Sequence, residues 1–164
     1  MGTAAVSAHP PFAAVHVSRS GTFRLPVAPA RAFPCFSPEG ERAWAPGWKP
    51  EYMDPADGAL RPGLVFRTNV GGEPTVWLLL RFDESSFEVE YVRLVPDSRV
   101  GLVHVRCAPA GAAETEVTVS YRLTALSEGA NRALERFSAE AFAGMMDEWR
   151  TAITAALSGS PRGA

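Results

Sequence analysis

The sequence contains very little lysine, few cysteines and no long apolar run. Lys49 is the single lysine among 164 residues, and 16 basic residues against 18 acidic ones leave a net charge of -2. Because nucleic-acid-binding proteins gather basic residues into dense patches, we expect no nucleic-acid partner. The longest apolar run, Val76 to Leu80, is too short to span a bilayer, and the N-terminus lacks the basic start and apolar stretch of a secretory signal. These absences predict no membrane span and a cytoplasmic location.

The motifs of metal and cofactor chemistry are also missing. Cys35 and Cys107 are the two cysteines, and neither belongs to a CxxC pair, so they form no disulfide framework or zinc cluster. The sequence has no Ser-His-Asp order, Walker loop, HExxH motif or dinucleotide-binding turn, and Gly71-Gly72 is typical of a hairpin turn. We therefore expect no metal and no cofactor, and we assign no catalytic residue. Whether the protein is an enzyme stays open.

Composition predicts one globular domain between two tails. The AVILMFWYC residues make up 46% of the chain and charged residues 21%, which is typical of a globular protein. Residues 1–13 and 158–164 are small, contain proline or glycine and show no periodicity, so they are predicted to be flexible tails. Residues 14–157 then form a single domain.

Hydrophobic periodicity predicts a strand, two short helices, six more strands and a long helix. His16–Leu25 alternates as a strand does, and Ala28–Ser37 and Pro38–Trp44 have the signals of short helices. From Gly129 to about Leu157 apolar residues recur every three or four positions, which predicts one amphipathic helix roughly 40 Å long. The six strands, separated by turn formers, are Glu51–Met53, Leu64–Val70, Thr75–Phe82, Phe87–Val95, Arg99–Cys107 and Glu114–Leu126.

This order of elements is that of an α+β fold with a curved antiparallel sheet. The long helix buries its apolar stripe most economically against one face of that sheet. Because a twisted sheet and a nearly straight helix diverge along their length, a cavity is expected between them wherever side chains leave the gap open.

Two segments carry a resemblance to a known superfamily. FRLPVAPARAF, from Phe23 to Phe33, and FSPEGERAWAPGW, from Phe36 to Trp48, resemble the opening of the SRPBCC or START-like superfamily. Its members include the birch-pollen allergen, lipid-transfer START domains, polyketide cyclases and chaperone activators. The resemblance covers about residues 14–157 and implies a helix-grip fold, in which a seven-stranded antiparallel sheet wraps the C-terminal helix and two short helices after strand 1 close one end of an apolar cavity.

Ten residues are candidates for contact with a ligand in that cavity. Aromatic and methionine side chains suit an adaptable apolar pocket, although at helical spacing they also serve as ordinary core packing. Tyr and His could orient a carbonyl or phenol and move protons. The candidates are Trp44, Trp48, Phe66, Tyr91, His104, Tyr121, Phe142, Met145, Met146 and Trp149.

Some side-chain directions cannot be decided from alternation. In Arg99–Cys107 both parities are apolar, so either Val103 and Val105 or Leu102 and His104 face inward. Val76–Leu80 is apolar at every position, and we place Trp77 and Leu79 on its outer side, where they would bind a protein partner or a second copy of the chain. Arginines on the strands, at positions 67, 81, 93 and 106, are expected on a solvated face, where one or two could form salt bridges with Glu88 or Glu90.

The function expected first is binding of a small hydrophobic or aromatic molecule, lipid-like or polyketide-like, between sheet and C-terminal helix. One alternative is an enzyme resembling the polyketide cyclases and aromatases. Another is a protein-binding module resembling the chaperone activators, and a homodimer is also possible.

Overall fold

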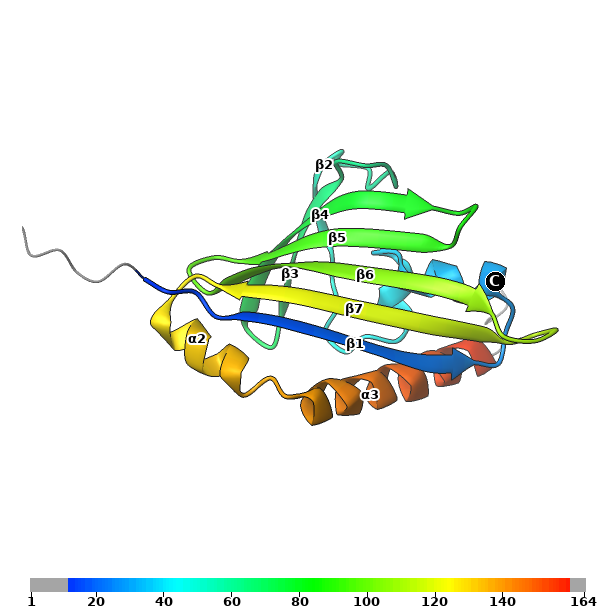
Figure 1. Cartoon of the computed structure of the whole chain (residues 1–164). Coiled ribbons are helices and arrows are strands. Elements are labelled where there is room, and N and C mark those ends of the chain that lie inside the picture. Colours follow the sequence, from blue (N-terminus) through cyan, green and yellow to red (C-terminus); the bar gives the residue numbers. More distant parts are fainter. Residues whose placement is uncertain (1–11, 160–164) are drawn as a thin grey trace, which may run out of the picture.

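A curved antiparallel sheet and a helix lying along one side of it form the body of the protein in a computed structural model that describes residues 12–159 (Figure 1). Within that range the sheet has seven strands in the order β1-β7-β6-β5-β4-β3-β2. The strands β2 to β7 form a meander of sequential neighbours, and β1 joins it by pairing with β7. The strands are β1 His16–Leu25, β2 Glu51–Asp54, β3 Val65–Val70, β4 Glu73–Asp83, β5 Glu88–Val95, β6 Arg99–Pro109 and β7 Thr115–Ala125.

Short helices follow β1, as the sequence predicts. They comprise α1 (Pro29–Ala32) and the 3₁₀ helices η1 (Phe33–Phe36) and η2 (Gly40–Ala43). Pro29 occupies the start of α1, where a missing N–H costs nothing. Phe33 and Phe36 are buried and fasten this segment to the core.

The prediction of a single C-terminal helix from Gly129 to Leu157 is wrong in one respect, because the chain forms two helices there. These are α2 (Glu128–Glu135) and α3 (Ala139–Ser158), with a break at residues 136–138. The side chain of Ser138 accepts a hydrogen bond from the Ala141 N–H and so begins α3, as Ser127 begins α2 through Ala130. With 20 residues, α3 is about 30 Å long, shorter than the sequence predicts.

The sheet presents one buried and one more exposed face. On β6 the buried residues are Val103, Val105 and Cys107, which settles the alternative that the sequence left open. On β4 the prediction is wrong, because Trp77 and Leu79 are buried on the inner face. Val76 and Leu80 point outward instead, so the outer apolar side chains of β4 are smaller than those we expected. A homodimer through this face stays a prediction.

The helix α3 packs most closely against β1. Its buried residues are Phe142, Met146 and Ile153. A Cβ atom added to Gly21 of β1 would lie 3.2 Å from both Phe142 and Met146, so the missing side chain lets the helix approach the strand. Figure 1 shows α3 running beneath β1, at the edge of the sheet. Strands on the other side of the sheet are therefore left without direct cover from this helix.

Asn131 of α2 holds the chain that leads into β1. The Val15 N–H donates to its Oδ1 atom at 2.8 Å, and its Nδ2 atom donates to the Ala13 carbonyl at 2.9 Å.

The predicted tails, 1–13 and 158–164, fall mainly outside the described residues and stay a prediction. Among the helices of residues 12–159, none combines the length and the hydropathy needed to cross a bilayer.

The close contact at Gly21 predicts opposite effects for two glycine substitutions. Gly21→Val should lower the free energy of unfolding by about 1–3 kcal/mol, because its methyl groups overlap Phe142 and Met146. Gly144→Ala, on an exposed position of α3 where an added Cβ meets no atom within 4 Å, should raise it by about 0.5–1 kcal/mol. Urea unfolding measures both, and a neutral Gly21→Val would contradict the packing described.

Candidate functional site

A cavity of about 730 Å³ lies between the inner face of the sheet, the segment around η2 and α3. Its volume falls in the range typical of small-molecule sites. The lining side chains come from elements far apart in the chain: Glu41, Trp44, Ala45, Pro46 and Trp48; Thr68 and Val70 of β3; Glu73, Thr75 and Trp77 of β4; Tyr91 and Arg93 of β5; Val103 and Val105 of β6; Tyr121 of β7; and Met145, Glu148, Trp149 and Ala152 of α3, together with Gly71.

All four tryptophans of the chain line this cavity. The Trp44 Nε1 atom donates to the Cys35 carbonyl and the Trp48 Nε1 atom to the Pro38 carbonyl, each at 2.8 Å. The ring centroids of Trp44 and Trp149 are 5.2 Å apart, and the Trp48 and Trp77 centroids are 5.5 Å apart, both pairs edge to face. The Trp77 Nε1 atom donates to Thr68 Oγ1 at 3.0 Å, so three of the four indoles are held in place by hydrogen bonds and the aromatic wall is preorganised.

Six of the ten candidate residues lie on the cavity wall, and three lie in the core behind it. Trp44, Trp48, Tyr91, Tyr121, Met145 and Trp149 line the cavity. Phe66 is stacked against Trp77 with centroids 6.0 Å apart, and Phe142 lies edge to face with Tyr121 at 5.6 Å. Met146 is buried near Gly21. These last three support the wall without lining it.

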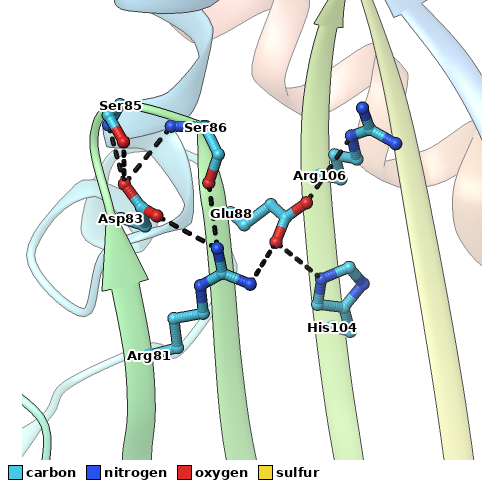
Figure 2. Close-up of polar contacts among 7 residues, drawn as sticks. All are labelled: Arg81, Asp83, Ser85, Ser86, Glu88, His104 and Arg106. Atoms are coloured by element: carbon cyan, nitrogen blue, oxygen red, sulfur yellow. Dashed lines mark hydrogen bonds and ion pairs between the residues drawn. The ribbon is translucent and has the colours of Figure 1, made fainter.

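The tenth candidate, His104, lies on the outer face of the sheet and not at the cavity. Its Nε2 atom is 3.8 Å from the Glu88 carboxylate, which also contacts Arg106, at 3.6 Å, and Arg81 (Figure 2). The expected salt bridges from strand arginines to Glu88 are thus present. The same cluster continues through Arg81 to Asp83. It is a network of ion pairs on a solvated sheet face, which explains the position of His104 without a functional role.

Two tyrosines bring hydroxyl groups to the cavity. The Tyr91 hydroxyl donates to the Phe36 carbonyl at 2.8 Å, and burial raises its pKa well above the usual range. Tyr121 makes no hydrogen bond to residues 12–159 through its hydroxyl, and burial raises its pKa to about 12. The Tyr121 hydroxyl is therefore a neutral donor that is free for a ligand.

Glu41 is a cavity residue that the sequence analysis did not identify. Its side chain lines the cavity beside Trp44. Its carboxyl group has no hydrogen bond or ion pair with residues 12–159, and burial raises its pKa well above the usual range. The spacing of three between Glu41 and Trp44 is the signal that could have placed both on one side of a 3₁₀ turn.

Arg93 is a second unforeseen cavity residue, because it points inward and not to the solvated face. Its Nη2 atom donates to Glu73 Oε1 at 3.0 Å, and Arg99 Nη2 donates to the same oxygen at 2.6 Å. Burial acts to raise the pKa of Glu73, but the hydrogen bonds and charges of Arg99 and Arg93 outweigh it and hold the pKa below its usual value. The Arg93 guanidinium carbon lies 5.5 Å from the Trp77 ring centroid.

The arrangement supplies an apolar aromatic chamber with a few polar groups, which is the usual constitution of a site for a small organic molecule. Within residues 12–159, no three His, Cys, Asp or Glu side chains gather as a metal site requires.

Several solved structures share this fold at low sequence identity. Norcoclaurine synthase from Thalictrum flavum, in complex with dopamine and hydroxybenzaldehyde, matches with a TM-score of 0.63 and 13% identity over 90% of this chain and 91% of that one. The Mll3558 protein from Rhizobium loti gives 0.61 and 18% over 88% and 99%. Ara h 8.0201 gives 0.63 and 13% over 88% and 100%. The chain therefore has the helix-grip fold, with its seven-stranded sheet and long C-terminal helix.

No protein-family model matches the chain, and no curated protein matches it. A likeness of fold alone does not assign an activity.

The raised pKa of Glu41 predicts a pH-dependent effect of Glu41→Gln on stability. The folded protein holds this proton more tightly than the unfolded chain, so the parent loses stability as the pH rises above the ordinary glutamate pKa of about 4.3. Glu41→Gln removes that loss. We expect its melting temperature at pH 7.5 to exceed that of the parent by at least about 2 °C, with the gain shrinking toward pH 4.

Thermal unfolding at several pH values provides the measurement. Glu135→Gln, at an exposed position of α2, serves as the control and should show no such trend. A Glu41→Gln protein equal to the parent at every pH would show that folding does not raise the pKa of this carboxyl group.

Proposed function

We propose that the protein binds a small hydrophobic or aromatic molecule in the cavity between the sheet and α3. The observation that carries the proposal is an open volume of about 730 Å³ walled by four indole rings. Interior space in proteins is normally filled to crystal-like density, so an unfilled aromatic chamber of this size is most simply a binding site. Apolar burial supplies the affinity, at about 25 cal/mol for each Å² removed from water.

The comparison with norcoclaurine synthase supports the proposal at the level of the fold. That enzyme was solved with dopamine and hydroxybenzaldehyde, which are small aromatic molecules. A helix-grip fold can therefore hold ligands of this size, and the six aromatic residues on the present cavity wall, which are Trp44, Trp48, Trp77, Tyr91, Tyr121 and Trp149, suit the same chemical class.

A proton-transfer enzyme resembling polyketide cyclases is a second candidate. It is favoured by one specific observation, since Tyr121 and Glu41 bring polar groups without hydrogen-bond partners in residues 12–159 to an apolar chamber. Such groups can polarise a carbonyl and move a proton. On this account Tyr121→Phe keeps ligand binding and abolishes turnover of a poly-ketone substrate, whereas turnover that survives removes Tyr121 from the mechanism. His104 has no part in it, because it lies on the outer face.

The alternative of a protein-binding module has lost the feature that motivated it. Trp77 and Leu79 were to supply an exposed apolar patch, and both are buried.

Binding of an uncharged probe to two matched tryptophan variants tests the proposal. Ala152 lines the cavity, one turn after Trp149, whereas Ala155 lies on an exposed position of the same helix. We expect Ala152→Trp to weaken binding of N-phenyl-1-naphthylamine by at least about tenfold, because the new ring occupies volume that the probe needs. Ala155→Trp should bind as the parent does, as measured by probe fluorescence. Equal affinity of all three proteins would contradict binding in this cavity.

A further inference from the structure

We propose that the ligand of this cavity is an organic acid, with an apolar body that lies against the tryptophans and an anionic head group that binds Arg93. The proposal rests on the proposed function and adds the chemical class of the ligand. Its basis is the cluster formed by Arg93, Glu73 and Arg99, in which both Arg93 and Glu73 line the cavity.

The charges of this cluster do not balance. Two guanidinium groups share one carboxylate, and in fact share the single oxygen Oε1 of Glu73. Arginine stays ionised at all physiological pH values, so one positive charge is left over at the wall. The side chains of Arg93 and Arg99 are 20% and 19% exposed, so water screens that charge only in part. A largely desolvated cation without its own counter-ion is costly, and an anionic group entering the cavity would relieve this cost.

The hydrogen bonds of Arg93 are incomplete as well. Of its five N–H donors, one has a partner among residues 12–159, through Nη2 to Glu73. Its Nε atom is the one buried side-chain nitrogen or oxygen in the described part of the chain that lacks a hydrogen-bond partner. Buried donors without partners are rare in native structures and call for an explanation. A carboxylate can accept two parallel hydrogen bonds from the edge of a guanidinium group, including Nε.

Neighbouring groups allow Arg93 to turn to a ligand. Arg99 holds Glu73 with the shorter of the two hydrogen bonds, 2.6 Å against 3.0 Å, so Glu73 keeps a partner when Arg93 leaves it. The face of Trp77 lies against the guanidinium group and supports it in the cavity wall. Tyr121 is close enough for the charge of Arg93 to act on its hydroxyl, which can donate a further hydrogen bond to the head group.

The other acids of the cavity do not neutralise Arg93. Desolvation raises the pKa of Glu41 well above its usual range and so disfavours its charged form, and Glu41 forms no ion pair with residues 12–159. Glu148 lies at an exposed position of α3 and has no salt bridge to the described residues. An organic acid is therefore the ligand class that supplies the negative charge and the hydrogen-bond acceptors that Arg93 lacks.

Three probes with one apolar body and different head groups test the inference. They are 3-(2-naphthyl)propanoate and the primary alcohol and primary amine of the same carbon skeleton, measured by calorimetry at neutral pH. We expect the parent protein to bind the carboxylate at least about tenfold more tightly than the alcohol, since hydrogen bonds to a charged group are stronger than neutral ones. Arg93→Gln should abolish this preference, because the loss of affinity falls mainly on the carboxylate probe.

Two further variants make the test independent of how Arg93→Gln folds. Glu73→Gln frees Arg93 from its carboxylate and should increase the preference for the carboxylate probe. Arg106→Gln, on the outer face beside Glu88, is the matched arginine control and should leave the preference unchanged.

The possible results separate the two proposals. Equal affinity of the parent for carboxylate and alcohol would overturn the role of Arg93 while leaving apolar ligand binding intact. Preference for the amine would also overturn it, because it would place the head group at a carboxyl group such as Glu41. The role of Arg93 would likewise be overturned by a carboxylate preference that persists in Arg93→Gln and is unchanged in Glu73→Gln. Failure of all three probes to bind would count against the proposed function itself.

Discussion

The close contact of α3 with β1 at Gly21 is the constraint on which the rest of the structure depends. It fixes the helix against one edge of the sheet, where a larger residue on β1 would meet Phe142 and Met146. A helix about 30 Å long is nearly straight, whereas the sheet curves and twists, so contact at this edge means separation elsewhere. The tryptophans of the segment after η2 and of β4 and α3 wall the resulting space without filling it.

The polar groups of the cavity differ in how far the protein satisfies them. Trp44, Trp48 and Tyr91 have their N–H or O–H donors bonded to backbone carbonyls, so they serve as fixed parts of the wall. Arg93 has unused donors and shares its counter-ion with a second arginine. Fixed walls provide shape and apolar contact, and groups left without partners provide selectivity. The contrast between the satisfied wall residues and the unsatisfied Arg93 is the physical basis for proposing an organic acid as the ligand.

Local patterns in the sequence predicted the strand count, the paired short helices and the α+β arrangement of a curved antiparallel sheet with a C-terminal helix, because alternation and turn residues are properties of neighbouring positions. The helix-grip fold was implied by the resemblance of Phe23–Phe33 and Phe36–Trp48 to the SRPBCC superfamily. Where the hydrophobic pattern was ambiguous, tertiary packing decided which side chains of a strand face the core. Both parities of Arg99–Cys107 are apolar, and Val76–Leu80 is apolar throughout, so only the paired strands determine that Val103 and Trp77 face inward. The break before α3 follows from the Ser138 cap, which the helical periodicity conceals.

The site was predictable in its aromatic part and not in its charged part. Trp44, Trp48 and Trp149 could be placed from composition and helical spacing. The inward direction of Arg93 and the position of Glu41 at the cavity depend instead on elements distant in the chain, such as β4 with Glu73 beside Arg93. The ¹H–¹⁵N signals of the four indole groups test the central claim most directly. On titration with an uncharged aromatic probe, all four should shift along one saturating curve with 1:1 stoichiometry. Unchanged indole signals, with shifts confined to outer-face residues such as Val76 and Leu80, would contradict it.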